Sequence, residues 1–305
     1  MRQINKLFFS ASLLFSANIF TLEIPRGFGV DFYEAMSCVK QNIPAYQASS
    51  DWQRAIELYN NFVSNPQFAQ GPSRIPKIIH QIWLGSPIPD RYKKFQDTWR
   101  INHPDWEYIL WTDKEVAEFG LKNQAQYDAS VNWGQKADIA RYEILNRYGG
   151  LYIDVDFECL RPFDIFHHTC DFYTGVTYGP NFALYNGLIG VAPNHQMMQL
   201  CIEKMNIHQK FHKDPIINIL YSSGPYFFTR MYKNYMHTAT DASVAFPVGY
   251  FYPWPNTFRY ENEREQIEKW FKQETFAVHH WTVSWNGGIA PGQTKGGDNE
   301  FGEVY

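Results

Sequence analysis

Hydrophobic residues recur along this chain in segments that alternate between the spacing of strands and the spacing of helices. A near-continuous apolar run at 77–84 predicts a buried strand of a parallel sheet, and residues 90–100 predict the helix that follows it. Residues 106–111 and 113–118 repeat this strand and helix pair. The alternation is typical of an α/β domain with a mainly parallel central sheet flanked by helices.

The longest patterned segment begins at Ala137 and combines a helix, a glycine stop and a strand. Apolar residues at helical spacing predict a helix that ends at the double glycine of 149–150. The residues after it predict a strand. Side chains alternate along a strand, so Tyr152, Asp154 and Asp156 would share one face while the apolar residues between them face the core.

Two segments precede this domain and one follows it. Residues 1–22 place basic residues before a broken apolar run, which is the layout of a signal peptide or signal anchor. Such a segment would anchor the protein in a membrane or export it. Residues 23–73 predict a small helical N-terminal extension. We therefore expect the main domain at 74–290 and a flexible tail at 291–305.

Composition and charge narrow the choice of function. With 305 residues and 45% apolar residues, the chain can bury one large core. The formal net charge is −4 and the pI is about 6.2, so we expect no nucleic-acid partner. The four cysteines form no C-x-x-C pair and fit free buried thiols better than a disulfide framework or a zinc site.

The two aspartates of the strand are the first candidate site. Carboxylates two residues apart repel each other and raise each other's pKa unless a cation lies between them. Mg²⁺ and Mn²⁺ bind carboxylate oxygens and leave other positions for water and phosphate groups. Asp154 and Asp156 therefore indicate a divalent metal site, and the structural alternative is two solvated side chains at the end of a strand.

The preceding helix carries a second charged pair, Asp138 and Arg141, which are three residues apart and border its apolar stripe. One interpretation is an exposed ion pair, worth only about 0.3 to 0.5 kcal/mol. The other places the helix beside the strand end, where Asp138 would hydrogen-bond a sugar and Arg141 would face a phosphate or sugar oxygen.

The pattern A-D-x-x-R-Y-x-x-L-x-x-x-G-G-x-Y-x-D-x-D at 137–156 resembles the sugar-binding region of Asp-x-Asp glycosyltransferases of family 32, which are mannosyltransferase-like. It is more distantly similar to the catalytic domain of large glucosylating toxins. A second match begins at Ile75 with I-P-K-I-I-H-Q-I-W-L-G and continues to Asp113. The resemblance spans most of the chain, from Arg74 to Gly288, and implies a nucleotide-sugar-binding domain of the GT-A type.

The resemblance also implies roles for individual residues. The expected catalytic residues are Asp138, Arg141, Asp154, Asp156 and Asn186. The nucleotide sugar would be bound by Asp138, Arg141 and Asp154 together with Trp83, which would stack on the base, and Tyr152, Ser284 and Trp285. The metal would be bound by Asp154, Asp156 and a histidine from His279 and His280. Strand alternation allows only one of these two histidines to point at the aspartates, and we favour His279.

These expectations describe a metal-dependent, retaining glycosyltransferase. It would transfer a hexose from a UDP- or GDP-sugar to a hydroxyl of a glycan, lipid or protein, with Mn²⁺ or Mg²⁺ as its cofactor. Two alternatives remain open at this point. One is a metal-dependent nucleotide-sugar hydrolase or phosphoesterase that uses the same aspartates. The other is a carbohydrate-binding protein with a degenerate site.

Overall fold

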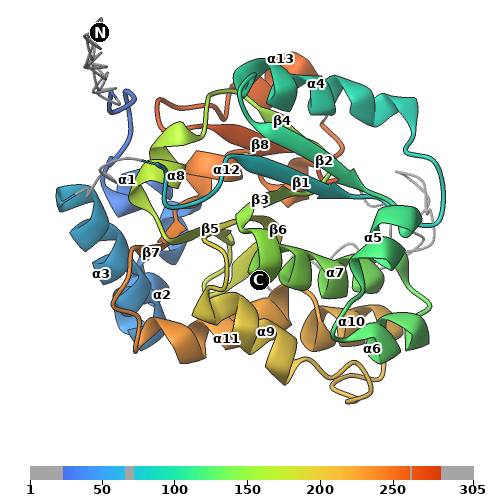
Figure 1. Cartoon of the computed structure of the whole chain (residues 1–305). Coiled ribbons are helices and arrows are strands. Elements are labelled where there is room, and N and C mark those ends of the chain that lie inside the picture. Colours follow the sequence, from blue (N-terminus) through green and yellow to red (C-terminus); the bar gives the residue numbers. More distant parts are fainter. Residues whose placement is uncertain (1–22, 66–71, 262, 283–305) are drawn as a thin grey trace, which may run out of the picture.

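A six-stranded mixed sheet forms the centre of the computed structural model, which describes residues 23–65, 72–261 and 263–282 (Figure 1). Its strand order is β2-β1-β3-β6-β5-β7. Only β6 runs against its neighbours, so the other five strands point in one direction. The strands are β1 (Ile78–Ile82), β2 (Glu107–Trp111), β3 (Gly150–Ile153), β5 (Phe172–Val176), β6 (Leu184–Val191) and β7 (Ser243–Phe246).

A second, two-stranded sheet joins distant parts of the chain. It pairs β4 (Phe157–Cys159) with β8 (Ala277–His279) in antiparallel fashion, with Phe157 opposite His279. Because only three residues separate the end of β3 from the start of β4, this pairing places the end of β8 beside the residues that follow β3.

Helices cover both faces of the main sheet (Figure 1). On one side α7 (Trp133–Tyr148) packs against β3 and α9 (Gln196–Lys204), and α11 (Pro225–Met236) packs against β6. Helix α4 (Lys93–Asn102) packs against β4 of the second, two-stranded sheet. The remaining helices are η2 (Asp90–Tyr92), α5 (Asp113–Phe119), α6 (Gln124–Ala129), α8 (Asp164–Thr169), α10 (Pro215–Ser222), α12 (Val248–Phe251), η3 (Asn256–Phe258) and α13 (Arg264–Glu268).

The N-terminal helices pack against the sheet edge at β7. They are α1 (Phe32–Ala35), η1 (Ser37–Asn42), α2 (Ile43–Ala48) and α3 (Ser50–Ser64). Trp52 and Tyr59 of α3 are fully buried in the same core as Phe246 of β7. The division of the chain at residue 73 stays a prediction, and the signal segment and tail lie outside the described residues. No helix in the described part of the chain has the length and apolar character needed to cross a membrane.

The predicted α/β architecture with a mainly parallel sheet is confirmed. The double glycine after α7 has a clear steric role, because both residues adopt positive φ angles of 64° and 97°. A Cβ on Gly150 would lie 2.7 Å from the carbonyl oxygen of Ile78. Only glycine allows β3 to start this close to β1, which explains the sharp transition from helix to strand.

A buried histidine fixes the same corner of the fold. His80 of β1 is fully buried, and its Nε2 donates to the carbonyl oxygen of Gly149 at 2.9 Å. Its Nδ1 accepts from the indole nitrogen of Trp111 at 3.1 Å. These two bonds require the neutral imidazole, because a protonated Nδ1 could not accept. Burial lowers the pKa of His80 to about 4.

His80 should therefore make the protein sensitive to mild acid. The folded pKa lies below the unfolded value of about 6.5, so its contribution is complete above pH 6.5 and is lost as the pH falls toward 4. Over this range the free energy of unfolding should fall by about 3 kcal/mol on account of His80. Urea unfolding of the protein and of His80→Gln at several pH values measures this. Gln can donate and accept without titrating, so equal slopes in both proteins would contradict the assignment.

Candidate functional site

Three potential metal ligands meet where β3 and β8 end. One ligand atom from each of Asp154, Asp156 and His279 can be chosen so that all three lie within 4.8 Å of one another. Asp154 directly follows β3, and His279 is the last residue of β8. The pairing of β4 with β8 brings this histidine to the aspartates from a position more than a hundred residues later in the chain. No other group of this kind occurs among the described residues.

The prediction that Asp154 and Asp156 share the face of one strand is wrong. Strand β3 ends at Ile153, and the next three residues form a turn in which Phe157 N donates to the carbonyl oxygen of Asp154 at 3.2 Å. In the turn Val155 packs against Tyr92 and Phe95, so the chain curls around this apolar contact. The two carboxylates meet because the backbone bends there.

Asp156 is held firmly from both sides. It is 3% exposed, and its Oδ1 lies 2.9 Å from Nε2 of His279. Its Oδ2 accepts from the backbone nitrogen and hydroxyl of Thr282, at 2.7 and 2.9 Å. Burial alone would raise the pKa of Asp156, but the imidazole and the Thr282 hydrogen bonds outweigh it and keep the pKa below its usual value. The carboxylate of Asp156 is therefore ionised, and His279 and Thr282 fix its orientation.

Asp154 lies in a different environment. A third of its side chain is exposed, and its Oδ1 accepts from the hydroxyl of Tyr152 at 2.7 Å. Burial raises the pKa of Asp154, and the guanidinium of Arg141 at 3.6 Å opposes that rise. Opposite Asp154, a Cβ on Gly187 would lie 2.6 Å from its Oδ2. Glycine at this position of β6 leaves room for the carboxylate.

Arg141 and Asp138 form the centre of a buried network. They are 5% and 6% exposed, and Nη2 of Arg141 lies 3.2 Å from Oδ1 of Asp138. The same carboxylate accepts from Asn186 Nδ2 at 2.9 Å and from the hydroxyl of Ser223 at 2.8 Å. Arg141 also donates to the carbonyl oxygen of Asn186 and lies 4.3 Å above the ring of Tyr152. The interpretation as an exposed ion pair is therefore wrong.

This network connects Asp138 to the candidate metal ligands through Arg141, which contacts both Asp138 and Asp154. Both oxygens of Asp138 already accept hydrogen bonds from the protein. Asp138 is thus placed to hold Arg141 and Asn186 in position, and a sugar hydroxyl would have to share its oxygens. Tyr152 is 2% exposed and contacts Arg141 and Asp154, and its expected contact with the nucleotide stays a prediction.

Trp83 lies next to the turn that carries the aspartates. It follows β1, is half-buried, and packs with Ile88 on the small cluster of Tyr92, Phe95 and Val155. Its ring centroid is 5.1 Å from that of Tyr92. The structure therefore brings the proposed base-stacking residue and the aspartate turn together, although they are more than seventy residues apart in the sequence.

The two neighbouring histidines separate. His280 Nε2 lies 2.9 Å from Glu158, and its ring stacks on Phe95 with centroids 4.3 Å apart. It does not belong to the group formed by the aspartates and His279. The expectation that His280 binds the metal is therefore not supported, because Glu158 already holds its imidazole. Ser284 and Trp285, the other residues expected here, lie outside the described part of the chain.

Sequence reasoning missed three residues of this site. Gly187 carried a usable signal, because a glycine inside a strand often marks close approach of another group. Ser223 follows α10, and its hydroxyl donates to Asp138 from a position 85 residues later in the chain, so no local pattern indicates it. Thr282 had no signal, since its contact with Asp156 exists only in the folded chain.

The donor set of this group fits a divalent cation such as Mn²⁺. Two carboxylates and one imidazole offer oxygen and nitrogen ligands. Mn²⁺ binds both kinds of ligand, whereas Mg²⁺ prefers the carboxylate oxygens. His279 Nδ1 is buried and has no hydrogen-bond partner among the described residues. The proton can therefore lie on Nδ1 without displacing a partner there. Nε2, which faces Oδ1 of Asp156 at 2.9 Å, would then offer its lone pair to a cation.

Comparison with known proteins gives consistent matches. Residues 89–172 match the family described as "Glycosyltransferase sugar-binding region containing DXD motif". The chain is 31% identical over 182 residues to inositol phosphoceramide mannosyltransferase 3 of Schizosaccharomyces pombe, covering 58% of this chain and 49% of that protein. It is 30% identical over 209 residues to inositol phosphoceramide mannosyltransferase 1 of the same organism, covering 64% and 63%.

A solved structure, the PaToxG glycosyltransferase, aligns with 20% identity and a TM-score of 0.45, covering 67% of this chain and 80% of that one. The chain spans about half to two thirds of the length of the two curated relatives. The aspartates and Arg141 lie within the segment matched by the family, whereas His279 lies outside it.

Proposed function

We propose that the chain is a metal-dependent, retaining hexosyltransferase, because residues 89–172 match the glycosyltransferases whose sugar-binding region contains the DXD motif. It would take a hexose from a UDP- or GDP-sugar and transfer it to a hydroxyl acceptor. The observation that supports this best is the convergence of Asp154, Asp156 and His279 beside the buried guanidinium of Arg141. A cation and a fixed guanidinium suit a departing diphosphate.

Each residue then has a defined task. Asp154, Asp156 and His279 would hold the cation, which would neutralise the negative charge that develops on the leaving nucleoside diphosphate. Thr282 keeps Asp156 oriented, and Arg141 adds a second positive charge that does not need to move during the reaction. Trp83 would stack on the base at the edge of the site.

The proposed stereochemistry is retention, as the family resemblance implies. The carboxylates of Asp138 and Asp156 have both oxygens engaged by protein groups. Asp154 is the remaining carboxylate, and we assign it to the cation. No carboxylate of the described site is therefore free to act as a covalent nucleophile, which supports attack from the face of the leaving group.

The relatives suggest which substrates to test first. They are named inositol phosphoceramide mannosyltransferases, so mannose is the first donor sugar and an inositol phosphoceramide the first acceptor that we propose. An acceptor of this kind would bring the enzyme to a membrane surface. Glycan and protein hydroxyls remain alternative acceptors.

Thermal unfolding with candidate donors tests the proposal. We expect one donor from a panel of GDP- and UDP-hexoses to raise the melting temperature by several degrees in the presence of Mn²⁺, and to have little effect without it. A ligand at a hundred times its Kd stabilises the folded state by about 2.7 kcal/mol. The controls are Mn²⁺ alone and each nucleoside diphosphate alone. If no donor stabilises the protein, or if hexose appears only as free sugar when acceptor is present, the proposal is wrong.

A further inference from the structure

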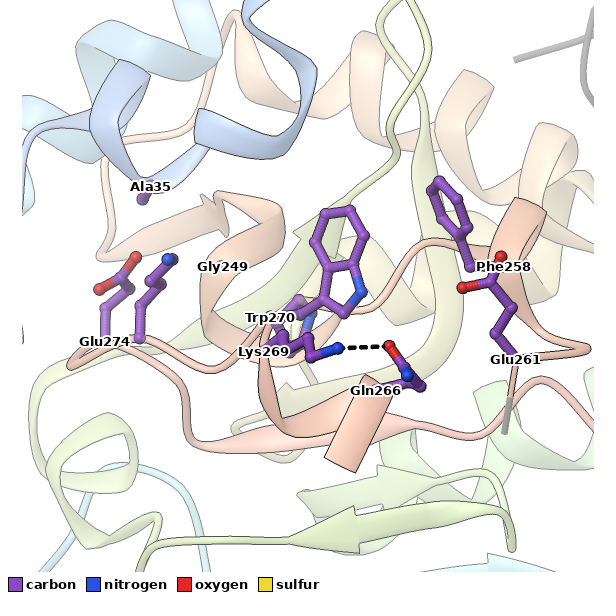
Figure 2. Close-up of a pocket in the computed structure, with 10 residues that line it drawn as sticks. Ala35, Gly249, Phe258, Glu261, Gln266, Lys269, Trp270 and Glu274 are labelled. Atoms are coloured by element: carbon purple, nitrogen blue, oxygen red, sulfur yellow. Dashed lines mark hydrogen bonds between the residues drawn. The ribbon is translucent and has the colours of Figure 1, made fainter. Parts of the chain in front are cut away.

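A second pocket, with a volume of about 390 Å³, opens between α12, η3 and α13 (Figure 2). It shares no lining residue with the group of Asp154, Asp156 and His279. Its size lies at the lower end of the range of roughly 300 to 1,000 Å³ that is typical of small-molecule sites. Its lining includes Gly249, Phe258, Glu261, Gln266, Trp270 and Glu274.

One part of this pocket is aromatic. The rings of Phe258 and Trp270 have centroids 5.3 Å apart and planes inclined at 38°. Phe258 is 37% exposed and Trp270 is half-buried, so both rings can meet a ligand. The indole nitrogen of Trp270 makes no hydrogen bond to any described residue. An apolar surface with a free donor suits a ligand that has both apolar and polar groups.

A buried carboxylate lies on the other side of the pocket (Figure 2). Glu274 is 6% exposed and forms no hydrogen bond or ion pair with another side chain in the described ranges. Burial raises its pKa, and the nearby Glu34 adds to that rise. Its Oε1 lies where a side chain at Gly249 would begin, since a Cβ there would be 2.9 Å away. The backbone N–H of Glu274 and the charge of Lys272 partly oppose the rise in the pKa of this carboxyl. Because the carboxylate lines the pocket, a ligand hydroxyl would donate to it.

The remaining polar groups decide which ligand fits. Lys269 and Lys272 balance the charges of Glu261 and Glu274, so the lining favours neither an anion nor a cation. Lys269 donates to Oε1 of Gln266 at 2.7 Å, and the NH₂ of that amide has no partner among the described residues. The pocket therefore offers hydrogen-bond donors and acceptors next to aromatic rings. Neutral molecules with many hydroxyl groups match this combination.

We propose that this pocket is an accessory saccharide-binding site that holds one hexose residue of a glycan. The C–H face of the sugar ring would lie against Trp270 and Phe258, and its hydroxyls would donate to Glu274 and accept from Gln266 and Trp270. Binding here needs neither the cation nor the nucleotide sugar. The inference therefore goes beyond the proposed transfer reaction and does not depend on it.

Saturation-transfer NMR with the full chain and α-mannobiose tests this site, without metal or nucleotide. We expect a Kd on the order of 1 mM, and at least a tenfold weaker affinity in Trp270→Ala and in Glu274→Gln. Ile101→Ala changes an exposed side chain of α4 and should leave the affinity unchanged. Asp156→Asn should also bind the sugar normally, because it alters only the candidate metal site.

Several results would overturn the assignment. The first is an absence of saturation transfer at a sugar concentration of about ten times the expected Kd. The second is an unchanged affinity in both pocket variants. The third is binding that requires Mn²⁺ or is lost in Asp156→Asn. Displacement of the sugar by inorganic phosphate would show that the lysines select an anion instead. Glu274→Gln preserves the size of the side chain, so it remains informative if circular dichroism shows that Trp270→Ala is misfolded. Donor-induced thermal stabilisation is measured separately, so either proposal can fail alone.

Discussion

Replacing Asp156 with Asn is expected to lower hexose transfer by about a thousandfold, which corresponds to about 4 kcal/mol of transition-state stabilisation. The amide has the size of the carboxylate but carries no charge. It can still accept one hydrogen bond from Thr282 or His279, so the fold should persist. The cation, however, loses its best oriented anionic ligand. Transfer assays with the preferred donor, together with calorimetric titration of Mn²⁺, measure both effects.

The matched control for this variant is Asp241→Asn. Asp241 is another hydrogen-bonded carboxylate, which accepts from Tyr235 and Ser243 beside the edge strand β7. Neutralising Asp241 should leave Mn²⁺ affinity and turnover within about twofold of the unchanged protein, because the two sites share no partners. Unchanged turnover in Asp156→Asn, or equal losses in the two variants, would contradict the role of Asp156.

Replacing Arg141 with Met should destabilise the fold as well as abolish transfer. The positive charge of the guanidinium faces both Asp138 and Asp154, and Asp138 is only 6% exposed. Breaking a buried pair by removing one partner costs about 3 to 5 kcal/mol, because the other charge is left uncompensated. Arg141→Lys keeps the charge but cannot reach Asn186, Asp138 and Asp154 together. We expect it to fold well and to lose most transfer activity.

Urea unfolding of the single and double variants tests the electrostatic origin of this effect. Asp138→Asn in the Arg141→Met background removes the uncompensated charge and should recover at least about 1 kcal/mol of the loss, which would appear as a coupling energy in a double-mutant cycle. Purely additive losses would mean that Arg141 stabilises the fold through packing alone. Full activity in Arg141→Lys would mean that a positive charge is sufficient.

Much of the framework followed from local patterns. Three predictions depend only on residues that are close in the sequence, and all three appear in the structure. They are the strand within 77–84, the helix before the double glycine, and the alternation of strands and helices. Polar residues at strand ends also directed attention to Trp83 and the aspartates, because ligands of parallel sheets bind at the carboxyl ends of the strands. Asn186 and His279 entered through a family resemblance.

Other features depend on contacts that sequence patterns do not contain. The end of β3 at Ile153 is decided by the packing of Val155 on Tyr92 and Phe95, which lie sixty residues earlier. The environment of Asp138 is decided by Ser223 and Asn186. Ser223 reaches it from the turn between α10 and α11, and Asn186 reaches it from β6. Strand alternation could separate His279 from His280, but only the position of Glu158 explains why His280 turns away.

Residue type and local spacing within 137–156 are enough to select the two aspartates and the arginine on the preceding helix as candidate site residues, whereas the histidine near the C-terminal end came from the family resemblance. How these residues are arranged follows only from the fold. It bends the aspartates into a turn, buries Arg141 against two carboxylates and brings His279 to Asp156 through the pairing of β4 with β8. The physical reason is that charge, burial and ligand distance depend on partners far away in the chain.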